Sequence, residues 1–493
     1  MRKPIEVPKS SHRSAIQRLA ILLIPVLFIG ITSFNLLYPI PTGPPDNGDF
    51  NRIFSSFSSG PLGLDFWPAT ENQEVYQQRF YNFYHRFWRN DEGKKEFAHF
   101  SSSSLFFWPG RCLNLTPGVF DLAWNTFLLI LLGGGMLYLC LKKIHESTAI
   151  FSMGALALLF ADVNIAGYLN SFYQESGTFL FFLLWVWFLH VFFTHRSLLS
   201  LGITCVLSLV LAGTKAVFIP SVLWALFSLL TGISLFSRGN GRWRRYTIII
   251  AGPILLAAIV LAQAMVVTPG NERQANCYMF IFGGALPQLS PSEGRDYLRK
   301  LGLDSSLISL SGKDAYLADS QLNRLYKKLT PRLHFTAIKQ LVLDYPGAFF
   351  ELIRFGFSRA GFYPRLNYPS LGEGQGPKFS FRWDFWSRFH FRFLHGAPYF
   401  AFVLFLIAIL SVLVWIRKDS GWPFFYLLVA GSFFPASILQ ILISVLGNGP
   451  FDIFKHHYFG NLLLDAALIT ALCGLAEIGI TLWEKRKAGQ QAS

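Results

Sequence analysis

Ten long apolar runs along the chain limit its fold more than any other feature. A helix that crosses a membrane needs about 20 mostly apolar residues. The runs lie at residues 15–38, 120–141, 148–161, 177–193, 198–212, 218–236, 248–267, 399–416, 424–446 and 462–483. The third and fifth runs are short, as in partly re-entrant segments. We therefore predict an all-α polytopic membrane protein with about ten transmembrane helices.

The composition supports this class of protein. Only 14% of the 493 residues are charged and 52% are hydrophobic, whereas soluble domains carry about 25% charged residues. The net charge of +15 is explained by cytoplasmic Lys and Arg and by attraction to anionic lipid headgroups. We expect membrane lipids and no nucleic acid as partners, because no basic run is long enough for nucleic-acid binding. The first apolar run is too long for a cleaved signal peptide, so we expect a retained helix.

Lys and Arg in the short connections predict how the chain lies in the membrane. They cluster at residues 2–18, 142–143, 196, 238–245, 417–418 and 485–487. All these clusters fall on one side if the amino terminus is cytoplasmic, where positively charged loops usually lie. We predict a multi-pass protein of the cell (inner) membrane with both termini cytoplasmic. Residues 1–493 then form one membrane domain, in which 41–117 and 268–398 are long outer loops and 399–493 are the last transmembrane helices.

The pattern within the two outer loops predicts interfacial helices. Residues 72–89 have helical spacing and many aromatic side chains, as in helices that lie on a membrane. Helical periodicity recurs at 292–300, 318–329 and 335–355, with a break at Pro346-Gly347, and the Gly-rich stretch 371–378 predicts a flexible loop. Cys112 and Cys277 fall in these two loops, so a disulfide between them stays open. No spacing of Cys and His predicts a zinc site.

An acidic turn just after the first apolar run is the strongest candidate for chemistry. Residues 44–52 read Pro-Pro-Asp-Asn-Gly-Asp-Phe-Asn-Arg, with a carboxylate on either side of a glycine. Turn formation explains Asp46 equally well, because these residue types favour turns. A site that handles a sugar hydroxyl next to a phosphate needs such groups. We select Asp49 as the catalytic residue and Asp46 and Arg52 as substrate-binding residues.

A second polar cluster lies between the third and fourth runs, at residues 162–175. It holds the candidate catalytic residues Asp162 and Glu175 and the candidate substrate-binding residues Asn170, Tyr168 and Tyr173. A carboxylate at the start of a helix also favours the helix dipole, which is an alternative explanation for Glu175. Acidic groups at membrane depth are costly and usually functional, which supports a role in the site.

Two further stretches supply positive charge on the same side. Lys215 lies between the fifth and sixth runs, either as a lysine that reaches for the interface or as a phosphate contact. Lys455 and His456 can hold a lipid phosphate through charge-assisted hydrogen bonds. Asn461 and Asp465 are four residues apart and share a helix face. Adjacent histidines point apart on a helix, so we predict no metal ligands here.

Together these stretches resemble the GT-C superfamily of membrane glycosyltransferases. The sequences Gly-Asp-Phe-Asn-Arg at 48–52 and Asn-Ser-Phe-Tyr-Gln-Glu at 170–175, with Lys455, His456, Asn461 and Asp465, are similar to the bacterial glycan-biosynthesis hexosyltransferase group. The resemblance covers most of the chain in layout and these short motifs in detail. One departure is that the first loop has Asp46-x-x-Asp49 and no Asp-Glu or Asp-x-Asp pair. No cofactor is therefore required by the motifs, and dependence on a divalent metal stays open.

The resemblance implies transfer of a hexose from a polyprenyl-phosphate carrier to a cell-surface glycan or lipid-linked acceptor on the extracytoplasmic face. It also implies that the long loop after the seventh span closes over the substrates. We expect inverting transfer with Asp49 as the general base and Glu175 or Asp162 orienting a substrate. The remaining groups neutralise the departing phosphate or pack on the sugar: Lys215, Lys455, His456, Tyr168 and Tyr173.

Two other functions fit parts of the sequence. An O-antigen polymerase or ligase also has many spans and a basic outer loop, for which Arg354, Arg359 and Arg365 are the candidate residues. A transporter or lipid flippase fits the apolar content, but it should show inverted repeats and helices broken at the midplane. The polar residues here cluster toward one surface instead, which favours the glycosyltransferase.

The predicted orientation can be checked with reporter fusions. Fusions at Gly110 and Gly374 should report an extracytoplasmic position, and a fusion at Arg242 should report a cytoplasmic one, because the charged clusters define the inner side. Alkaline phosphatase and fluorescent-protein reporters distinguish the two sides. A cytoplasmic signal at Gly374 would contradict this layout and the site that depends on it.

Overall fold

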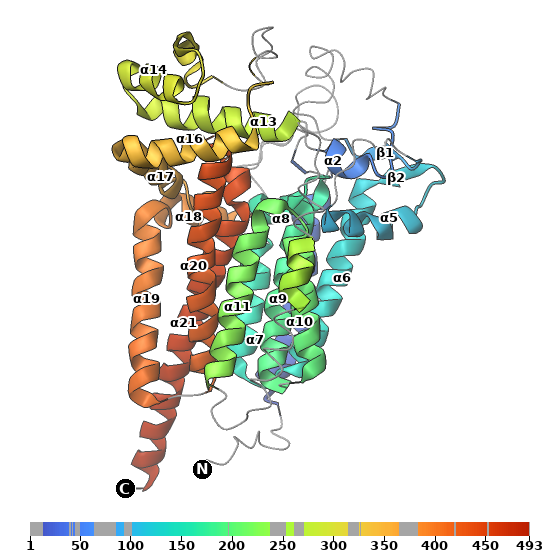
Figure 1. The fold of residues 1–493 in the computed structure, drawn as a ribbon. Coiled ribbons are helices and arrows are strands. Elements are labelled where there is room, and N and C mark those ends of the chain that lie inside the picture. The colour runs from blue at the N-terminus through green and yellow to red at the C-terminus, as the bar shows by residue number, and fades with distance from the viewer. Residues whose placement is uncertain are drawn as a thin grey trace.

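Long apolar helices lie side by side in the computed structural model and form a bundle (Figure 1). The structure describes residues 13–38, 41, 43–44, 50–63, 85–92, 101–195, 197–236, 253–260, 271–313, 325, 327–363, 383–418, 421–450 and 453–492. The bundle helices are α1 (Ala15–Leu37), α6 (Leu122–Lys143), α7 (Ser147–Phe160), α9 (Glu175–His195), α10 (Leu198–Ala212), α11 (Ile219–Phe236), α19 (Gly396–Arg417), α20 (Trp422–Asn448) and α21 (Ile453–Ala492).

The helices show a multi-pass membrane protein. In the described part of the chain, seven helices are long and apolar enough to cross a membrane, or up to eight if the bent pair Ser147–Phe160 and Val163–Asn170 is one span. The predicted number of ten is not confirmed. The short α10 does not qualify by length, and the predicted run 248–267 is described only at 253–260, which is helical. The other predicted runs coincide with helices of the bundle.

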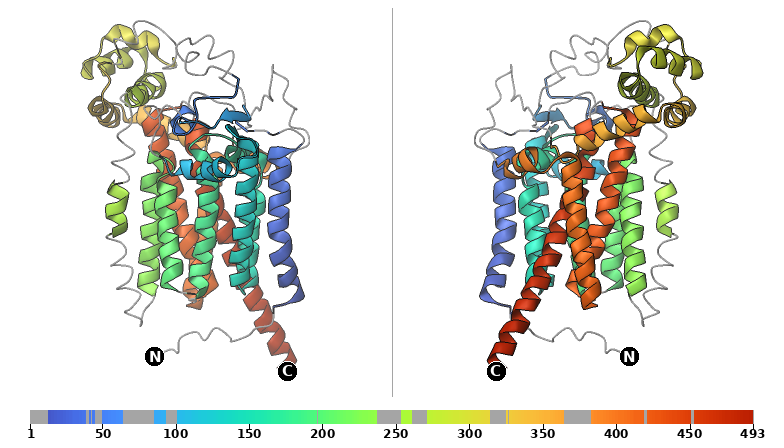
Figure 2. Two further views of the ribbon diagram at one scale, coloured as in Figure 1. Left: turned by 90° about the vertical axis from the view of Figure 1, so that its right-hand side faces the viewer. Right: turned by 90° about the vertical axis from the view of Figure 1, so that its left-hand side faces the viewer.

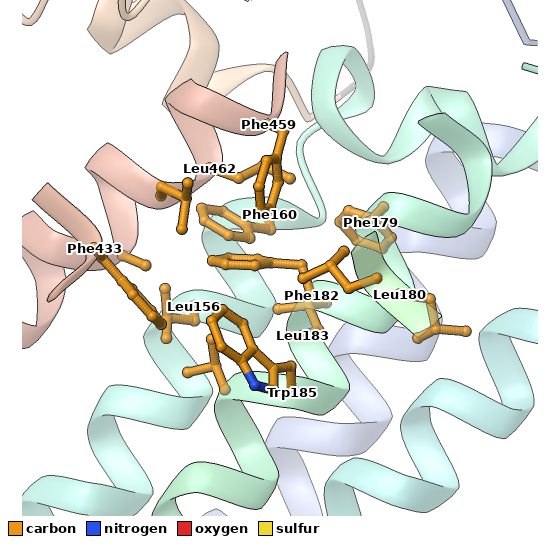
Figure 3. Close-up of a cluster of buried hydrophobic side chains, with 14 of the residues drawn as sticks. Leu156, Phe160, Phe179, Leu180, Phe182, Leu183, Trp185, Phe433, Phe459 and Leu462 are labelled. Carbon is orange, nitrogen blue, oxygen red and sulfur yellow. The ribbon is translucent and has the colours of Figure 1, made fainter. Parts of the chain in front are cut away.

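Helix α9 lies at the centre of the apolar core. Figure 3 shows Phe182 of α9 against Phe160 of α7 and Phe433 of α20, with ring centroids 6.1 and 5.9 Å apart. The ring centroid of Trp185, one turn further along α9, lies 5.2 Å from that of Phe433. Burial of such large rings accounts for much of the stability of the bundle. It also fixes the start of α9 relative to α20 and α21.

The two ends of the bundle differ in character. We call the end where α1 begins and α21 ends the terminal end, and the opposite end the loop end (Figures 1 and 2). At the terminal end, Arg13 donates hydrogen bonds to backbone carbonyls at the end of α6, which carries Lys142 and Lys143. Arg417 lies at the same end, where α19 finishes. The basic clusters that the structure describes thus gather at one end, as the orientation argument requires.

Small elements of the first long segment cover part of the loop end. They are α2 (Asn51–Phe54), β1 (Phe87–Arg89), η2 (Ser102–Phe107), α5 (Trp108–Cys112) and β2 (Val119–Asp121). Strands β1 and β2 pair antiparallel, and the guanidinium of Arg86 donates two hydrogen bonds to Asp121 beside them. Residues 87–89, predicted as the end of a helix, are therefore a strand, because their backbone pairs with β2. The rest of that predicted helix, 72–84, lies outside the described residues.

A helical subdomain with its own core lies across the loop end. It comprises α13 (Asn271–Tyr278), the π-helix η5 (Met279–Ala285), η6 (Leu286–Gln288), α14 (Pro291–Lys300), η7 (Ser305–Leu310), α16 (Pro331–Asp344) and α17 (Pro346–Ser358). Helices α14, α16 and α17 fall where helical periodicity and the break at Pro346 predicted them. Cys277 is buried in the core of this subdomain and Cys112 is exposed elsewhere, and both are free. The two therefore form no disulfide, and burial raises the pKa of the Cys277 thiol to about 12.

The subdomain is attached to the last turn of α20. The ring of His334 on α16 donates a hydrogen bond of 2.9 Å from Nε2 to the carbonyl oxygen of Leu446. Gly449, which follows α20, has φ of 61°, and a Cβ atom there would lie 2.8 Å from the carbonyl oxygen of Met279. Only glycine adopts this conformation at so close an approach without strain. The end of α20 is thus held from both sides.

Attachment of the subdomain should weaken as the pH falls. Burial lowers the pKa of His334 below its ordinary value near 6.5, so the docked state binds a proton less readily than the undocked state. The contribution of His334 to attachment of the subdomain is complete above about pH 6.5. It is lost as the pH falls toward the lowered pKa. Hydrogen exchange at the end of α20, corrected for the intrinsic pH effect, should show this. His334→Gln keeps an N–H donor but does not titrate, and a pH dependence that persists in it would exclude His334 as the cause.

Candidate functional site

Two helices are too short to reach the loop end at full membrane thickness. Helix α7 has 14 residues and α10 has 15, which correspond to about 21 and 23 Å, against a hydrocarbon core of about 30 Å. The chain bends by 74° after α7 into α8 (Val163–Ala166) and η3 (Gly167–Asn170). The irregular segments that follow, 161–174 and 213–218, therefore begin within the depth that the longer helices span.

The buried backbone of residues 161–174 is hydrogen-bonded by side chains of other helices. Asn35 of α1 donates to the carbonyl oxygen of Ala161 at 2.7 Å, and Thr126 of α6 donates to that of Leu169 at 3.1 Å. Tyr458 of α21 donates to the carbonyl oxygen of Ile165 at 2.8 Å. Backbone groups buried away from water need such partners. The segment is thus held rigidly at the point where α9 begins.

A buried ion pair joins the two irregular segments. Nζ of Lys215, just before η4 (Ala216–Phe218), lies 2.6 Å from Oε1 of Glu175, the first residue of α9. The two side chains are only 9% and 1% exposed. Lys215 therefore does not extend to water, and its carboxylate partner compensates a charge that would otherwise be costly to bury.

The start of α21 adds a lysine and a histidine to this pair. Nδ1 of His456 lies 3.4 Å from Nζ of Lys215, and Nζ of Lys455 lies 4.9 Å from the ring centre of Tyr173. Arg52 of α2 is close enough to act electrostatically on His456, as are both lysines. We call the cations Arg52, Lys215 and Lys455, together with the imidazole of His456, the cation cluster. The structure thus brings together four predicted site residues with Glu175 and Tyr173.

Helix α21 begins at Ile453, nine residues before the predicted run at 462. Lys455, His456 and Asn461 therefore lie on a helix and not in an outer loop. The hydropathy criterion places the start of the helix too late because it penalises polar residues, whereas here Lys455 and Asn461 are buried and have partners inside the protein.

Asp162 and Asn170 make contacts that support the backbone. Asp162 caps α8 by accepting from the amide of Asn164 at 2.9 Å. It also accepts from the amide and hydroxyl of Ser387 on α18 (Phe385–Phe393), at 2.8 and 2.9 Å. The side-chain oxygen of Asn170 accepts from Thr126 at 3.0 Å. These bonds connect α7, α18 and α6, and neither residue contacts the cation cluster through them.

Asp465 is the centre of a second buried network. Its carboxylate accepts from the hydroxyls of Tyr363 and Tyr399 at 2.8 and 2.6 Å and from the indole of Trp386 at 2.7 Å. Nε2 of His390 lies 3.0 Å away. Burial and the neighbouring carboxylate raise the pKa of Tyr363 well above its usual value, so it remains a hydroxyl donor.

Asn461 holds the chain just before Tyr363. It accepts from the amide of Gly361 and donates to the carbonyl oxygen of Phe362. Asn461 and Asp465 therefore share one face of α21, as their spacing predicted, and both bind the segment 361–363. Asp465 lies nine residues beyond His456, about 13 Å along the helix.

Asp46 and Asp49 lie outside the described residues. Phe50, which follows Asp49 in the chain, packs its ring 4.8 Å from that of Tyr173. Tyr168 lies 5.8 Å from Tyr173 and 4.7 Å from Tyr458 by ring centroids. Phe50, which follows the acidic stretch, thus packs on Tyr173, the same ring that contacts Lys455. In the described residues, no group of three or more His, Cys, Asp or Glu side chains is arranged to hold a metal ion.

Comparison with known families decides where the chain belongs. The YfdI N-terminal transmembrane domain matches residues 7–493. The chain belongs to this family. No curated protein and no solved structure matches it. The YfdI match covers the bundle, the helical subdomain and the cation cluster alike, so all of them are parts of one family domain.

Several residues of this YfdI-family site carry no clear signal in the sequence. Asn448 hydrogen-bonds His456 but stands in Gly-Asn-Gly-Pro, a typical turn sequence. Ser387 and His390 lie in a short aromatic helix that resembles an interfacial segment. The roles of Ser387 and His390 depend on Asp162 and Asp465, which are more than 60 residues away in the chain. No local pattern encodes such partners.

The Glu175–Lys215 pair should dominate the local stability. Glu175→Gln leaves a buried ammonium without its anion and should lower the free energy of unfolding by about 3–5 kcal/mol. The double variant with Lys215→Met should recover most of this loss, because no uncompensated charge remains. Denaturant unfolding of the purified protein measures both effects.

A matched control is the exposed pair of Arg354 and Glu351, whose side chains are 79% and 50% exposed. Glu351→Gln should leave stability unchanged, since solvent screens such pairs. Equal stability of Glu175→Gln and the wild type would show that the buried pair does not hold the segments together.

Proposed function

We propose that the protein is a membrane glycosyltransferase of the GT-C type. It transfers a hexose from a polyprenyl-phosphate donor to a cell-surface glycan or a lipid-linked acceptor, as part of polysaccharide biosynthesis in the cell envelope. The site faces the extracytoplasmic side of the cell membrane, and both termini lie in the cytoplasm. Membership of the YfdI transmembrane family is consistent with an enzyme of this kind.

The observation that carries this proposal is the cation cluster at the loop end. Lys215 is only 7% exposed and Lys455 only 8%. Burial of a cation is costly, so cations kept at membrane depth usually belong to a binding or catalytic site. They lie beside a histidine, an arginine and one buried acid at membrane depth. A phosphate attached to a lipid chain reaches this depth from within the bilayer, whereas a free phosphate in water has no such path.

The reaction follows from the charges. The acceptor hydroxyl attacks the anomeric carbon of the hexose, and the bond from that carbon to the phosphate oxygen breaks with inversion. The proton of the hydroxyl passes to the carboxylate of Asp49, the general base. The leaving polyprenyl phosphate gains one negative charge, and Lys215, Lys455 and Arg52 stabilise it as that charge develops.

The aromatic and acidic neighbours complete the site. Tyr173, stacked under Lys455, and Tyr168 beside it form one wall for the sugar. Glu175 fixes the ammonium of Lys215. Asp162, Asn170, Asn461 and Asp465 act from a distance by holding the segments that carry these groups. Asp46 and Arg52 are the parts of the acidic turn that contact substrate.

Of the three arginines considered for a polymerase or ligase, Arg365 lies outside the described residues, and the other two lend that function no support. Arg354 pairs with Glu351 on an exposed face of α17, and the guanidinium of Arg359 lies over the ring of Phe355. The cation cluster at the loop end therefore remains the candidate phosphate site.

Transfer of labelled sugar tests the proposal directly. Purified protein should move radiolabelled hexose from one member of a panel of polyprenyl-phosphate sugars to an acceptor glycan. In sealed vesicles the label should appear in the acceptor rather than cross the membrane. Movement of labelled lipid across the vesicle without transfer would identify a flippase and end the proposal.

Asp49→Asn should lower transfer by a factor of about 10² or more, in line with general-base contributions. Asparagine keeps the shape and hydrogen bonding of the side chain but cannot take the proton, so expression and donor binding should remain near wild type. Initial rates with saturating donor measure the effect. Asp46→Asn is the matched control and should cost much less. A reversed order of the two variants would make Asp46 the base.

A further inference from the structure

The last turn of α20 places one more side chain against the cation cluster. Asn448 is the final residue of α20, and its side-chain amide hydrogen-bonds Nε2 of His456. On the other side of the ring, Nδ1 lies 3.4 Å from Nζ of Lys215. His456 therefore connects the amide of Asn448 to the ammonium of Lys215.

The ammonium decides which nitrogen of His456 carries the proton. A lysine ammonium has three donors and no acceptor, and its 2.6 Å contact with Glu175 fits the charged form. Nδ1 must therefore accept, which leaves the proton of the neutral imidazole on Nε2. The structure places the amide nitrogen of Asn448 at Nε2, where it would meet a second donor. The oxygen and nitrogen of an amide exchange places by a half turn, so we assign the oxygen to this position, where it accepts from Nε2–H.

The same bonds orient Lys215. Two of its three N–H groups point to Glu175 and to His456. Among the residues that the structure describes, the third has no partner. An ammonium held by two acceptors cannot rotate freely, so its third N–H keeps one direction.

The helical subdomain in turn fixes Asn448. His334 holds the carbonyl of Leu446, and Gly449 meets the π-helix η5 at Met279. A π-helix inside a helical segment is rare and often lies at a functional site. The position of Asn448 thus depends on a subdomain that is separate from the bundle core.

We propose that Asn448 is a positioning residue of the donor site. By accepting Nε2–H it fixes the ring of His456, so that Nδ1 holds the ammonium of Lys215 with its third N–H turned to the phosphate of the donor. This inference rests on the proposed function for its ligand. The tautomer of His456 and its hydrogen bond to Asn448 do not.

The first experiment therefore uses the protein without substrate. Spectra of ¹⁵N-histidine-labelled protein, compared with those of His456→Gln, assign the signals of His456. The wild type should carry the proton on Nε2. Asn448→Ala should keep the proton on Nε2, because Lys215 still donates to Nδ1, but it should shift the Nε2 signal because the acceptor is lost. Asn448→Asp keeps an oxygen acceptor and should leave that signal near its wild-type position. Asn114→Ala removes an amide from a loop outside this network and should leave the signals unchanged.

The second experiment measures donor use with a polyprenyl-phosphate hexose and binding of polyprenyl phosphate itself. Asn448→Ala should raise the donor KM and weaken binding about 2- to 10-fold, the range for one lost hydrogen bond, with the acceptor KM unchanged. Asn448→Asp should raise the donor KM and weaken binding at least as much, because its carboxylate repels phosphate, although it keeps an acceptor for Nε2–H. A merely structural role would not separate the two readouts in this way.

Two results would overturn the proposal. One is a wild-type His456 with its proton on Nδ1. The other is Asn448→Ala with wild-type spectra and wild-type donor KM. A wild type that shows the expected tautomer but neither binds polyprenyl phosphate nor transfers hexose would instead overturn the proposed function, and with it the donor part of this inference.

Discussion

The loop end of the bundle depends on hydrogen bonds to one stretch of buried backbone. Residues 161–174 break the helix into short, sharply bent pieces and are almost entirely buried, so their peptide groups need partners within the protein. Asn35, Thr126 and Tyr458 supply them from three different helices. Each fixes its helix against the same segment. These hydrogen bonds to the least regular part of the bundle therefore fix how α1, α6 and α21 lie relative to one another.

The same burial accounts for the chemistry of the site. Lys215 follows a helix too short to bring it to water, so its charge must be compensated inside the protein, and Glu175 lies within 2.6 Å to do so. His456 and Lys455 arrive on α21, whose first turns are held by Tyr458 in that same backbone network. A phosphate that enters this region meets cations that are already oriented, which is the condition for strong electrostatic stabilisation of developing charge.

The sequence predicts the helices well and the contacts poorly, for identifiable reasons. Apolar runs locate the bundle helices because lipid demands about 20 apolar residues wherever a helix crosses. The same criterion starts α21 too late, since Lys455 and Asn461 are polar yet buried. Charge and loop position correctly bring Lys215, Glu175 and His456 together. Charge and position in the sequence cannot show whether an acid faces substrate or binds other side chains. Asp465 binds Tyr363, Tyr399 and Trp386, and these partners come from distant segments of the chain.

Lys215 joins two parts of the site that lie far apart in the chain. It contacts Glu175 in the amino-terminal half and His456 in the carboxy-terminal half. Groups that share one partner do not contribute additively, so a shift of α20 and α21 changes both the imidazole and the ammonium. The helical subdomain holds the turn between α20 and α21 through His334 and Gly449. Closure of that subdomain over a substrate would therefore act directly on the groups to which we assign phosphate binding.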